Sequence, residues 1–191
     1  DYRWVDLRTD ENQLMFKAQS CFVNAMRKFL LDRNFIEIHT PKLIAAASES
    51  GSEVFKVDYF DRNAYLAQSP QFYKQMAMAA GFERIFETGP VFRAEKSYTN
   101  KHSTEFSGFD LEFSYITSYK DVMKMEEELL TAGLQAVKDN YGDQIKEMFG
   151  QEVIVPTTPF PVVKLEDLYK GLEEEFGYKV DESEKGDLTT E

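Results

Sequence analysis

The chain has 191 residues, of which 42% are hydrophobic and 14% aromatic, and its formal net charge is −12 at pH 7. This composition excludes a disordered chain and suits one domain with a substantial core. The acidic balance excludes broad electrostatic wrapping of RNA, although a few local contacts stay compatible with it. One cysteine and two histidines exclude a disulfide framework and a zinc cluster. No apolar run is long enough to span a membrane, so we expect a soluble, cytoplasmic protein.

Helical and extended segments alternate along the chain, as hydrophobic spacing and turn residues indicate. Ser69-Pro70 is typical of a helix start, Gly81 of a helix end, and Ser118 with Asp121 of a capping box. Strands paired by hairpins and flanked by helices predict an α+β domain on an antiparallel sheet. In chain order, the predicted elements are a helix from about Thr9 to Asn34, an extended run Phe35–Ile38, strands Val54–Val57 and Ala64–Ala67 around a turn at Asp61–Asn63, a helix from Ser69-Pro70 to Gly81, strands at roughly Ile85–Glu95 and Glu105–Tyr115, a helix from Ser118 to about Tyr141, a strand Val153–Val155 and a helix Leu165–Phe176.

The hairpin of residues 85–115 carries most of the chemistry. Side chains alternate between the faces of a strand, so Arg93 and Glu95 share one face. That face offers an aromatic ring, a glycine and two carboxylates from the returning strand, which suits a ligand site; an exposed face with ordinary cross-strand ion pairs is the alternative. On the returning strand the polar-face set is Phe106, Gly108, Asp110 and Glu112, and the core set is Ser107, Phe109, Leu111 and Phe113.

The sequence of this hairpin resembles a known motif. GPVFRAE, ending at Glu95, and HSTEFSGFDLE, ending at Glu112, are similar to motif 2 of the class II aminoacyl-tRNA synthetases. The resemblance implies that Arg93 holds the ATP α-phosphate beside the amino-acid carboxylate. It also implies that Glu95 receives the adenine amino group and that Phe106 stacks on the adenine ring. A bidentate guanidinium suits two oxyanions that must be brought together.

The polar loop between these strands has further implied contacts. By the same resemblance, Lys101 and His102 reach the outer phosphates of ATP; family members usually carry arginine where this chain has Lys101. Ser97 and Thr99 would contact the acceptor end of the tRNA. For these last two residues a solvated turn is an equal alternative.

An earlier segment, FIEIHTPKL, follows the first long helix and resembles motif 1, which forms the dimer interface in this family. The resemblance implies a homodimer with Pro41 at its interface. A strand followed by proline is common, so this segment supports the family resemblance only together with the hairpin that follows it in the chain. We assign no catalytic role to His39, because a lone histidine at a strand end is more often structural.

The segment QSPQFYKQ, at the start of the second predicted helix, resembles the aspartyl type within the Asp/Asn/Lys subgroup. The resemblance implies that Lys74 pairs with the side-chain carboxylate of L-aspartate, whereas Ser69, Gln71 and Asp110 hold its ammonium group. By itself, a lysine on a helix is usually a solvated charge. A carboxylate in a closed pocket, however, needs a fixed cation nearby. Glu49, in a loop of small residues, matches the mobile lid over the amino acid.

The resemblance extends to about Leu188 and is closest to the archaeal-type aspartyl branch. It implies a parent enzyme that activates aspartate with ATP and Mg²⁺ and charges tRNA-Asp, or tRNA-Asn as well. Residues 1–191 would be a partial catalytic domain, inactive alone. Motif 3, the Mg²⁺ ligands and an N-terminal anticodon-binding OB domain would lie outside it. Two alternatives remain: an asparaginyl-tRNA synthetase, which Lys74 disfavours, and a non-charging paralogue that binds a small ligand, which the set Arg93, Glu95 and Phe106 disfavours.

Overall fold

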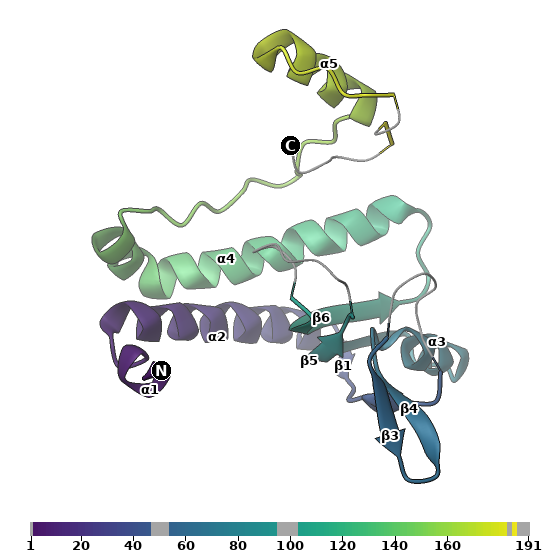
Figure 1. The fold of residues 1–191 in the computed structure, drawn as a ribbon. Helices are drawn as coiled ribbons and strands as arrows, with labels where there is room; N and C mark the ends of the chain where they lie inside the picture. The colour runs from purple at the N-terminus through teal and green to yellow at the C-terminus, as the bar shows by residue number, and fades with distance from the viewer. Residues whose placement is uncertain (1, 47–53, 95–102, 183–184, 187–191) are drawn as a thin grey trace. The chain divides into compact units, whose positions relative to one another are not determined.

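The computed structural model describes residues 2–46, 54–94, 103–182 and 185–186, and the chain divides into two compact units, Asp1–Val155 and Pro156–Glu191. Within the described residues, every helix is too short or too polar to cross a lipid bilayer. In the first unit the elements are α1 (Arg3–Asp6), α2 (Asp10–Leu31), β1 (Ile36–Glu37), β2 (Leu43–Ile44), β3 (Lys56–Tyr59), β4 (Arg62–Leu66), α3 (Gln71–Ala79), β5 (Arg84–Phe92), β6 (Glu105–Phe113) and α4 (Tyr119–Phe149) (Figure 1).

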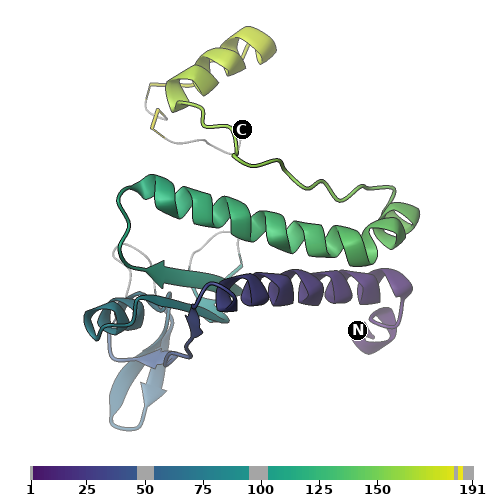
Figure 2. The same cartoon turned by 180° about the vertical axis from the view of Figure 1, so that it is seen from behind.

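The two long helices of this unit, α2 and α4, lie side by side (Figures 1 and 2). α2 begins after Thr9, whose side chain accepts a hydrogen bond from the Asn12 backbone N–H at 3.4 Å. The helices approach closely at Gly133 of α4, where a Cβ atom would stand 2.6 Å from Cε2 of Phe22 on α2. A glycine here therefore permits the close packing of the two helices.

The ends of α4 follow local sequence signals. Ser118 and Asp121 form the predicted capping box at its start. The helix continues past the predicted end near Tyr141 to Phe149. It stops at Gly150, whose φ of 66° lies in the left-handed region that glycine adopts without strain.

Two three-stranded sheets complete the first unit. In sheet I, with strand order β1-β5-β6, β1 runs parallel to β5 and β5 antiparallel to β6. In sheet II, with strand order β2-β4-β3, all neighbours are antiparallel. The α+β class and the mainly antiparallel pairing are thus confirmed, with one parallel pair added.

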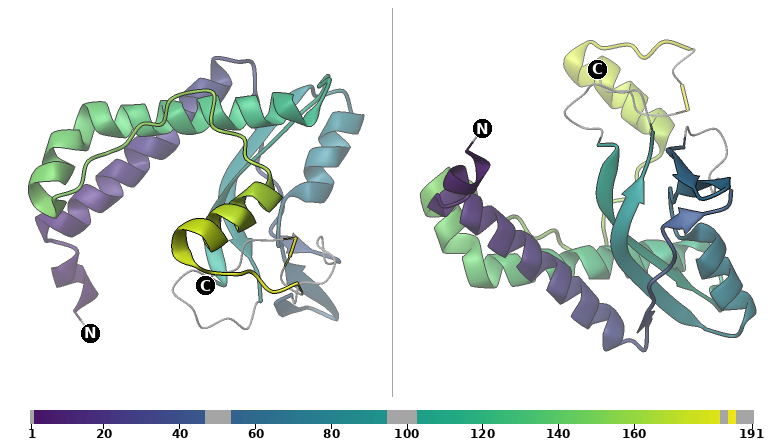
Figure 3. Two further views of the ribbon diagram at one scale, coloured as in Figure 1. Left: turned by 90° about the horizontal axis from the view of Figure 1, so that it is seen from above. Right: turned by 60° about the horizontal axis from the view of Figure 1, so that its bottom comes forward.

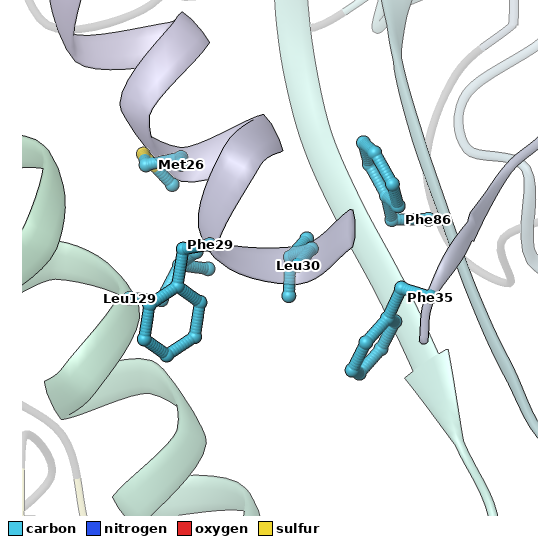
Figure 4. Packing of buried hydrophobic residues seen from close by; sticks show 6 residues of the cluster. All are labelled: Met26, Phe29, Leu30, Phe35, Phe86 and Leu129. Atoms are coloured by element: carbon cyan, nitrogen blue, oxygen red, sulfur yellow. The ribbon is translucent and has the colours of Figure 1, made fainter. Parts of the chain in front are cut away.

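The hydrophobic core lies between sheet I and the helices α2 and α4. Phe86 of β5 is completely buried, and its ring stacks on that of Phe109 with 5.8 Å between centroids. Phe109, Leu111 and Phe113 of β6 pack against the same cluster, as the strand alternation predicts. Figure 4 shows the cluster itself, which consists of Met26, Phe29, Leu30, Phe35, Phe86 and Leu129.

The predicted strand Val153–Val155 is wrong: these residues form no strand, and Ile154 is 80% exposed. Three apolar or β-branched residues in a row suit a strand, but a strand forms only where a neighbour offers ladder hydrogen bonds. β5 also ends earlier than predicted, at Phe92, and α1 was not predicted at all.

The β3–β4 turn and the start of α3 each differ by about one residue from prediction. The β3–β4 hairpin turns at Phe60 and Asp61, with a φ of 55° at Phe60. α3 begins one residue later than expected, because Pro70 occupies the N-cap position and Gln71 is the first helical residue. Ser69 still contributes, since its hydroxyl accepts a hydrogen bond from the Gln71 N–H at 3.3 Å.

The second unit contains α5 (Leu165–Phe176), at the predicted position. Gly177 ends this helix with a φ of 67°. Val180 is buried within the unit, and the hydroxyl of Tyr169 accepts a hydrogen bond from the Gly186 N–H at 2.9 Å. This bond links Gly186 to α5 of the same unit.

Candidate active site

The face of the β5–β6 hairpin opposite the core gathers the polar residues. Residues directly opposite each other in an antiparallel pair share a face. The observed register pairs Ile85 with Glu112, Glu87 with Asp110, Gly89 with Gly108 and Val91 with Phe106. We call this surface the site face. It lies on the side of sheet I where α3 and sheet II are found, away from α2 and α4 (Figure 3).

Lys74 stands at one end of the site face. Although it is a lysine on a short helix, it is only 5% exposed. Its ammonium group forms a short ion pair with Asp110 and a second one with Glu112, 3.2 Å from Oε2. The structure therefore joins Lys74 and Asp110 directly, with Gln71 one turn earlier on the same helix and Ser69 just before it. A solvated lysine, the default for a helix surface, is excluded.

Arg93 and Phe106 stand at the other end. The backbone N–H of Arg93 donates to the carbonyl of Thr104 at 3.0 Å, which extends the β5–β6 pairing by one residue. The guanidinium carbon of Arg93 lies 5.6 Å from the centroid of the Phe106 ring, within range of a cation–π contact. Arg93 Nε is buried and has no hydrogen-bond partner among the described residues. A buried donor without a partner is costly, so this guanidinium retains donor capacity for an anion.

Two glycines separate these ends. Gly89 and Gly108 face each other across the strands, and a Cβ on Gly89 would stand 3.7 Å from both Glu87 Oε1 and Lys42 Cε. The surface between the two ends therefore consists of backbone that a ligand can approach. The four steps along β6 from Phe106 to Asp110 span about 14 Å.

Sequence reasoning missed one buried charge on this face. Glu87 is 3% exposed and accepts hydrogen bonds from the Thr40 N–H (2.8 Å), the Thr40 hydroxyl (2.6 Å) and the Lys42 ammonium (2.9 Å). Burial alone raises the pKa of Glu87, but the bonds from Thr40 and Lys42 outweigh it and hold the pKa below its ordinary value of 4.5. Its position two residues before Gly89 on the polar side of the alternation was the available signal.

Several predicted site residues lie outside the described part of the chain. These are Glu49, Glu95, Ser97, Thr99, Lys101 and His102. Pro41 lies on an exposed surface in the segment between β1 and β2, next to Lys42. His39 is also exposed.

The described carboxylates of the site face do not fit a magnesium site. Asp110 and Glu112 are engaged by Lys74, and Glu87 by Thr40 and Lys42. No cluster of three or more acidic, histidine or cysteine ligands occurs among the described residues. Mg²⁺ needs free carboxylate oxygens, and at these positions the carboxylates are engaged by lysine and threonine donors.

Residues 1–188 match the family model described as tRNA synthetases class II (D, K and N). The chain belongs to this family. The site face lies on the hairpin whose sequence resembles motif 2 of this family, and α3 begins within the segment QSPQFYKQ, which resembles its aspartyl type.

Individual relatives agree. The aspartate–tRNA(Asp/Asn) ligase of Aeropyrum pernix is 42% identical over 191 residues, which is 100% of this chain and 42% of the relative. The cytoplasmic aspartate–tRNA ligase of Caenorhabditis elegans is 46% identical over 160 residues, 84% of this chain and 30% of the relative. The chain thus spans less than half the length of these relatives.

A solved structure, that of asparaginyl-tRNA synthetase from Pyrococcus horikoshii complexed with asparaginyl-adenylate, superimposes with a TM-score of 0.85. It is 34% identical in sequence, and the match covers 97% of this chain and 42% of that one. The class II catalytic fold is thereby shown for this chain. Aspartyl and asparaginyl enzymes share this fold, so the choice of amino acid depends on the residues of the site.

Proposed function

We propose that this chain is part of the catalytic domain of an aspartate–tRNA ligase. The buried Lys74, held by Asp110 and Glu112 on the site face, is the observation that carries the proposal. A fixed, desolvated cation suits a ligand with a free side-chain carboxylate, whereas the neutral amide of asparagine gains little from it. The name of the A. pernix relative supports the same substrate.

The reaction has two steps. An oxygen of the aspartate α-carboxylate attacks the α-phosphorus of ATP in line, the new C–O–P linkage forms, and the bond to pyrophosphate breaks. A terminal hydroxyl of tRNA then attacks the acyl carbon and releases AMP. No side chain need act as a nucleophile in the first step, because positioning and neutralisation of charge at phosphorus lower the barrier.

Arg93 is the residue we assign to that neutralisation. Its guanidinium has a buried Nε without a partner in the described part of the chain, and it lies beside the Phe106 ring, at the end of the site face that we assign to the nucleotide. Phe106 is 39% exposed, which leaves its ring surface for stacking on adenine. We further assign Glu95, Lys101 and His102 to ATP, Ser97 and Thr99 to the tRNA acceptor end, and Glu49 to the lid over the amino acid.

The charge balance at the amino-acid end explains which substrate group goes where. Three carboxylates (Glu87, Asp110 and Glu112) face two lysines (Lys42 and Lys74), so the net charge is +2 − 3 = −1. This balance favours the substrate's ammonium group, which we place at Asp110 with Ser69 and Gln71. The side-chain carboxylate of the substrate then pairs with Lys74. A further cation from outside the described residues balances the remaining negative charge of the substrate.

The substrates and assembly complete the proposal. ATP is the co-substrate, accompanied by Mg²⁺, and tRNA-Asp is the acceptor, with tRNA-Asn as well if the parent resembles the A. pernix enzyme in this respect. We assign motif 3, the Mg²⁺ ligands and an anticodon-binding domain to no residue of this chain. A homodimer through the exposed surface around Pro41 and a cytoplasmic location, as in the name of the C. elegans relative, are parts of the same proposal.

The test is amino-acid-dependent pyrophosphate exchange by the full-length enzyme with aspartate and with asparagine. We expect aspartate to support exchange and asparagine not to. Lys74→Met should lower kcat/KM for aspartate by about a hundredfold or more, because a buried carboxylate of the substrate loses its cation. Thermal unfolding of the variant separates this effect from loss of the fold, and Lys74→Arg keeps the charge as a second variant. Exchange with asparagine alone would instead make the parent an asparaginyl enzyme.

A further inference from the structure

We infer that Glu87 is a positioning residue for the amino-acid end of the site: it holds the Lys42 ammonium away from Asp110, so that Asp110 remains with Lys74. For its kinetic consequences this inference rests on the proposed function. Glu87 lies outside the sequence motifs, and Thr40 and Lys42 had no individual role within the segment that resembles motif 1.

The register places the two carboxylates concerned next to each other. Glu87 of β5 is directly opposite Asp110 of β6 on the site face. Cβ atoms of such partners are about 4.5–5.5 Å apart, and like charges at this position repel. Each carboxylate has its own lysine, however: Lys42 lies 2.9 Å from Glu87 Oε1, and Lys74 contacts Asp110. The face therefore carries two separate ion pairs side by side.

The bonds of Glu87 all come from one short segment. Of the residues that the structure describes, Thr40 and Lys42 supply the donors to Glu87, and they flank Pro41 between β1 and β2. The Thr40 hydroxyl donates to Glu87 Oε2 and accepts from Lys42 Nζ at 3.1 Å. Both partners of the Lys42 ammonium thus depend on the charge of Glu87.

The same segment is fixed to the rest of the site. The Lys42 carbonyl accepts from the Ala67 N–H at 2.9 Å, and the Ala67 carbonyl accepts from the Phe92 N–H at 2.9 Å. Phe92 directly precedes Arg93. The backbone of Lys42 therefore stays in place when Glu87 changes, and only its flexible side chain is released.

Neutralising Glu87 would redirect the Lys42 ammonium. The Lys42 side chain is 22% exposed, so its partly desolvated ammonium group favours a nearby carboxylate, and Asp110 is the carboxylate next to Glu87 on the face. Once Lys42 engages Asp110, it competes both with Lys74 and with the ammonium group of the incoming substrate. The site would keep its fold and its nucleotide end, but it would bind aspartate less tightly.

The first experiment measures kinetics in the full-length enzyme. Glu87→Gln should raise KM for aspartate about tenfold, with kcat and KM for ATP changed less than about threefold. The double variant Glu87→Gln/Lys42→Met should restore KM for aspartate, because the misdirected cation is gone. The matched control is Glu37→Gln on the neighbouring strand β1. It breaks a partly buried ion pair with Arg27 of α2 (3.0 Å) and should leave KM for aspartate unchanged.

The second experiment needs no activity. In the 191-residue chain with ¹⁵N-labelled lysine, the Lys74 Nζ resonance, identified by its loss in Lys74→Arg, should shift in Glu87→Gln and return in the double variant. An unchanged Lys74 signal and an unchanged KM for aspartate, with only a lower unfolding temperature, would overturn the inference and leave Glu87 a purely structural clamp. Absence of exchange in the unmutated enzyme, with the Lys74 shift intact, would overturn the proposed function and still support the role of Glu87.

Discussion

The two faces of the β5–β6 hairpin share one backbone but differ in the interactions of their side chains. On the core face, Phe86 and Phe109 stack and are covered by α2 and α4. On the site face, one residue along each strand, Glu87 and Asp110 are opposite each other, each with a lysine. Apolar burial holds the first face, and paired charges hold the second. Stability and chemistry are thus divided between the faces, and substitutions should separate them.

The largest effect on stability should come from the core face. Phe86→Ala removes a completely buried ring at the centre of the cluster and should lower the free energy of unfolding by about 3–5 kcal/mol. Chemical denaturation of the 191-residue chain measures this loss. A loss below about 1 kcal/mol would show that the cluster is not the main core of the unit.

The site face should respond in the opposite way. Arg93→Ala in the full-length enzyme should reduce aspartyl-adenylate formation at least about a hundredfold, because charge at phosphorus loses its main donor. The free energy of unfolding should change by less than about 1 kcal/mol, since the contacts of Arg93 within the described residues are a ring contact with Phe106 and a backbone hydrogen bond that the substitution keeps. A pyrophosphate-exchange rate near that of the unmutated enzyme would refute the assignment of Arg93.

The helix layer behind the core face offers a matched pair of glycines. A Cβ at Gly133 would stand 2.6 Å from Phe22, so Gly133→Ala should destabilise by roughly 1–3 kcal/mol, less the ~1 kcal/mol that alanine gains in a helix. Gly142, on the same helix, has only Lys138 Cγ nearby, at 3.6 Å. Gly142→Ala should therefore stabilise by up to about 1 kcal/mol. Equal effects in denaturant melts would mean that α2 and α4 do not pack closely at Gly133.

The smallest effect concerns the free energy of unfolding at acidic pH. The folded pKa of Glu87 lies below its ordinary value of 4.5, so the unfolded chain binds this proton more readily. Its contribution to stability is complete above about pH 4.5 and is lost as the pH falls through the folded pKa. Glu87→Gln should flatten the fall of unfolding free energy below pH 4.5. The pH dependence of the unfolding free energy that remains includes the contribution of Asp121, whose pKa is also lowered, chiefly by a hydrogen bond from the backbone N–H of Thr117. An unchanged slope in Glu87→Gln would contradict this account.

Local rules predicted most of the fold because their causes are local. The capping box at Ser118 and the glycine after α3 depend on hydrogen bonds within a few residues, and both were confirmed. The strand at Val153–Val155 failed for the converse reason. A strand requires a partner, and no sequence window shows whether one is available.

In the candidate site, too, features with local causes were predicted, whereas contacts between distant segments were not. Alternation along β6 predicted which side chains share a face, and the register confirmed it for Phe106 and Asp110. The burial of Lys74 could not be derived from helix periodicity, which treats a lysine as solvated; the resemblance of its segment to a known motif supplied that expectation. Glu87 was missed altogether, because its partners lie 47 and 45 residues away, at Thr40 and Lys42.

The sequence by itself determined the class II family, the α+β class and the face of the hairpin on which the polar residues gather, since each depends on short motifs or on the period of two along a strand. Only the tertiary structure decided how the charges of that face are shared. Lys74 serves Asp110 and Glu112, while Lys42 serves Glu87. The physical reason is that an ion pair in a buried site depends on distances of a few ångströms between segments far apart in the chain, and packing alone sets those distances.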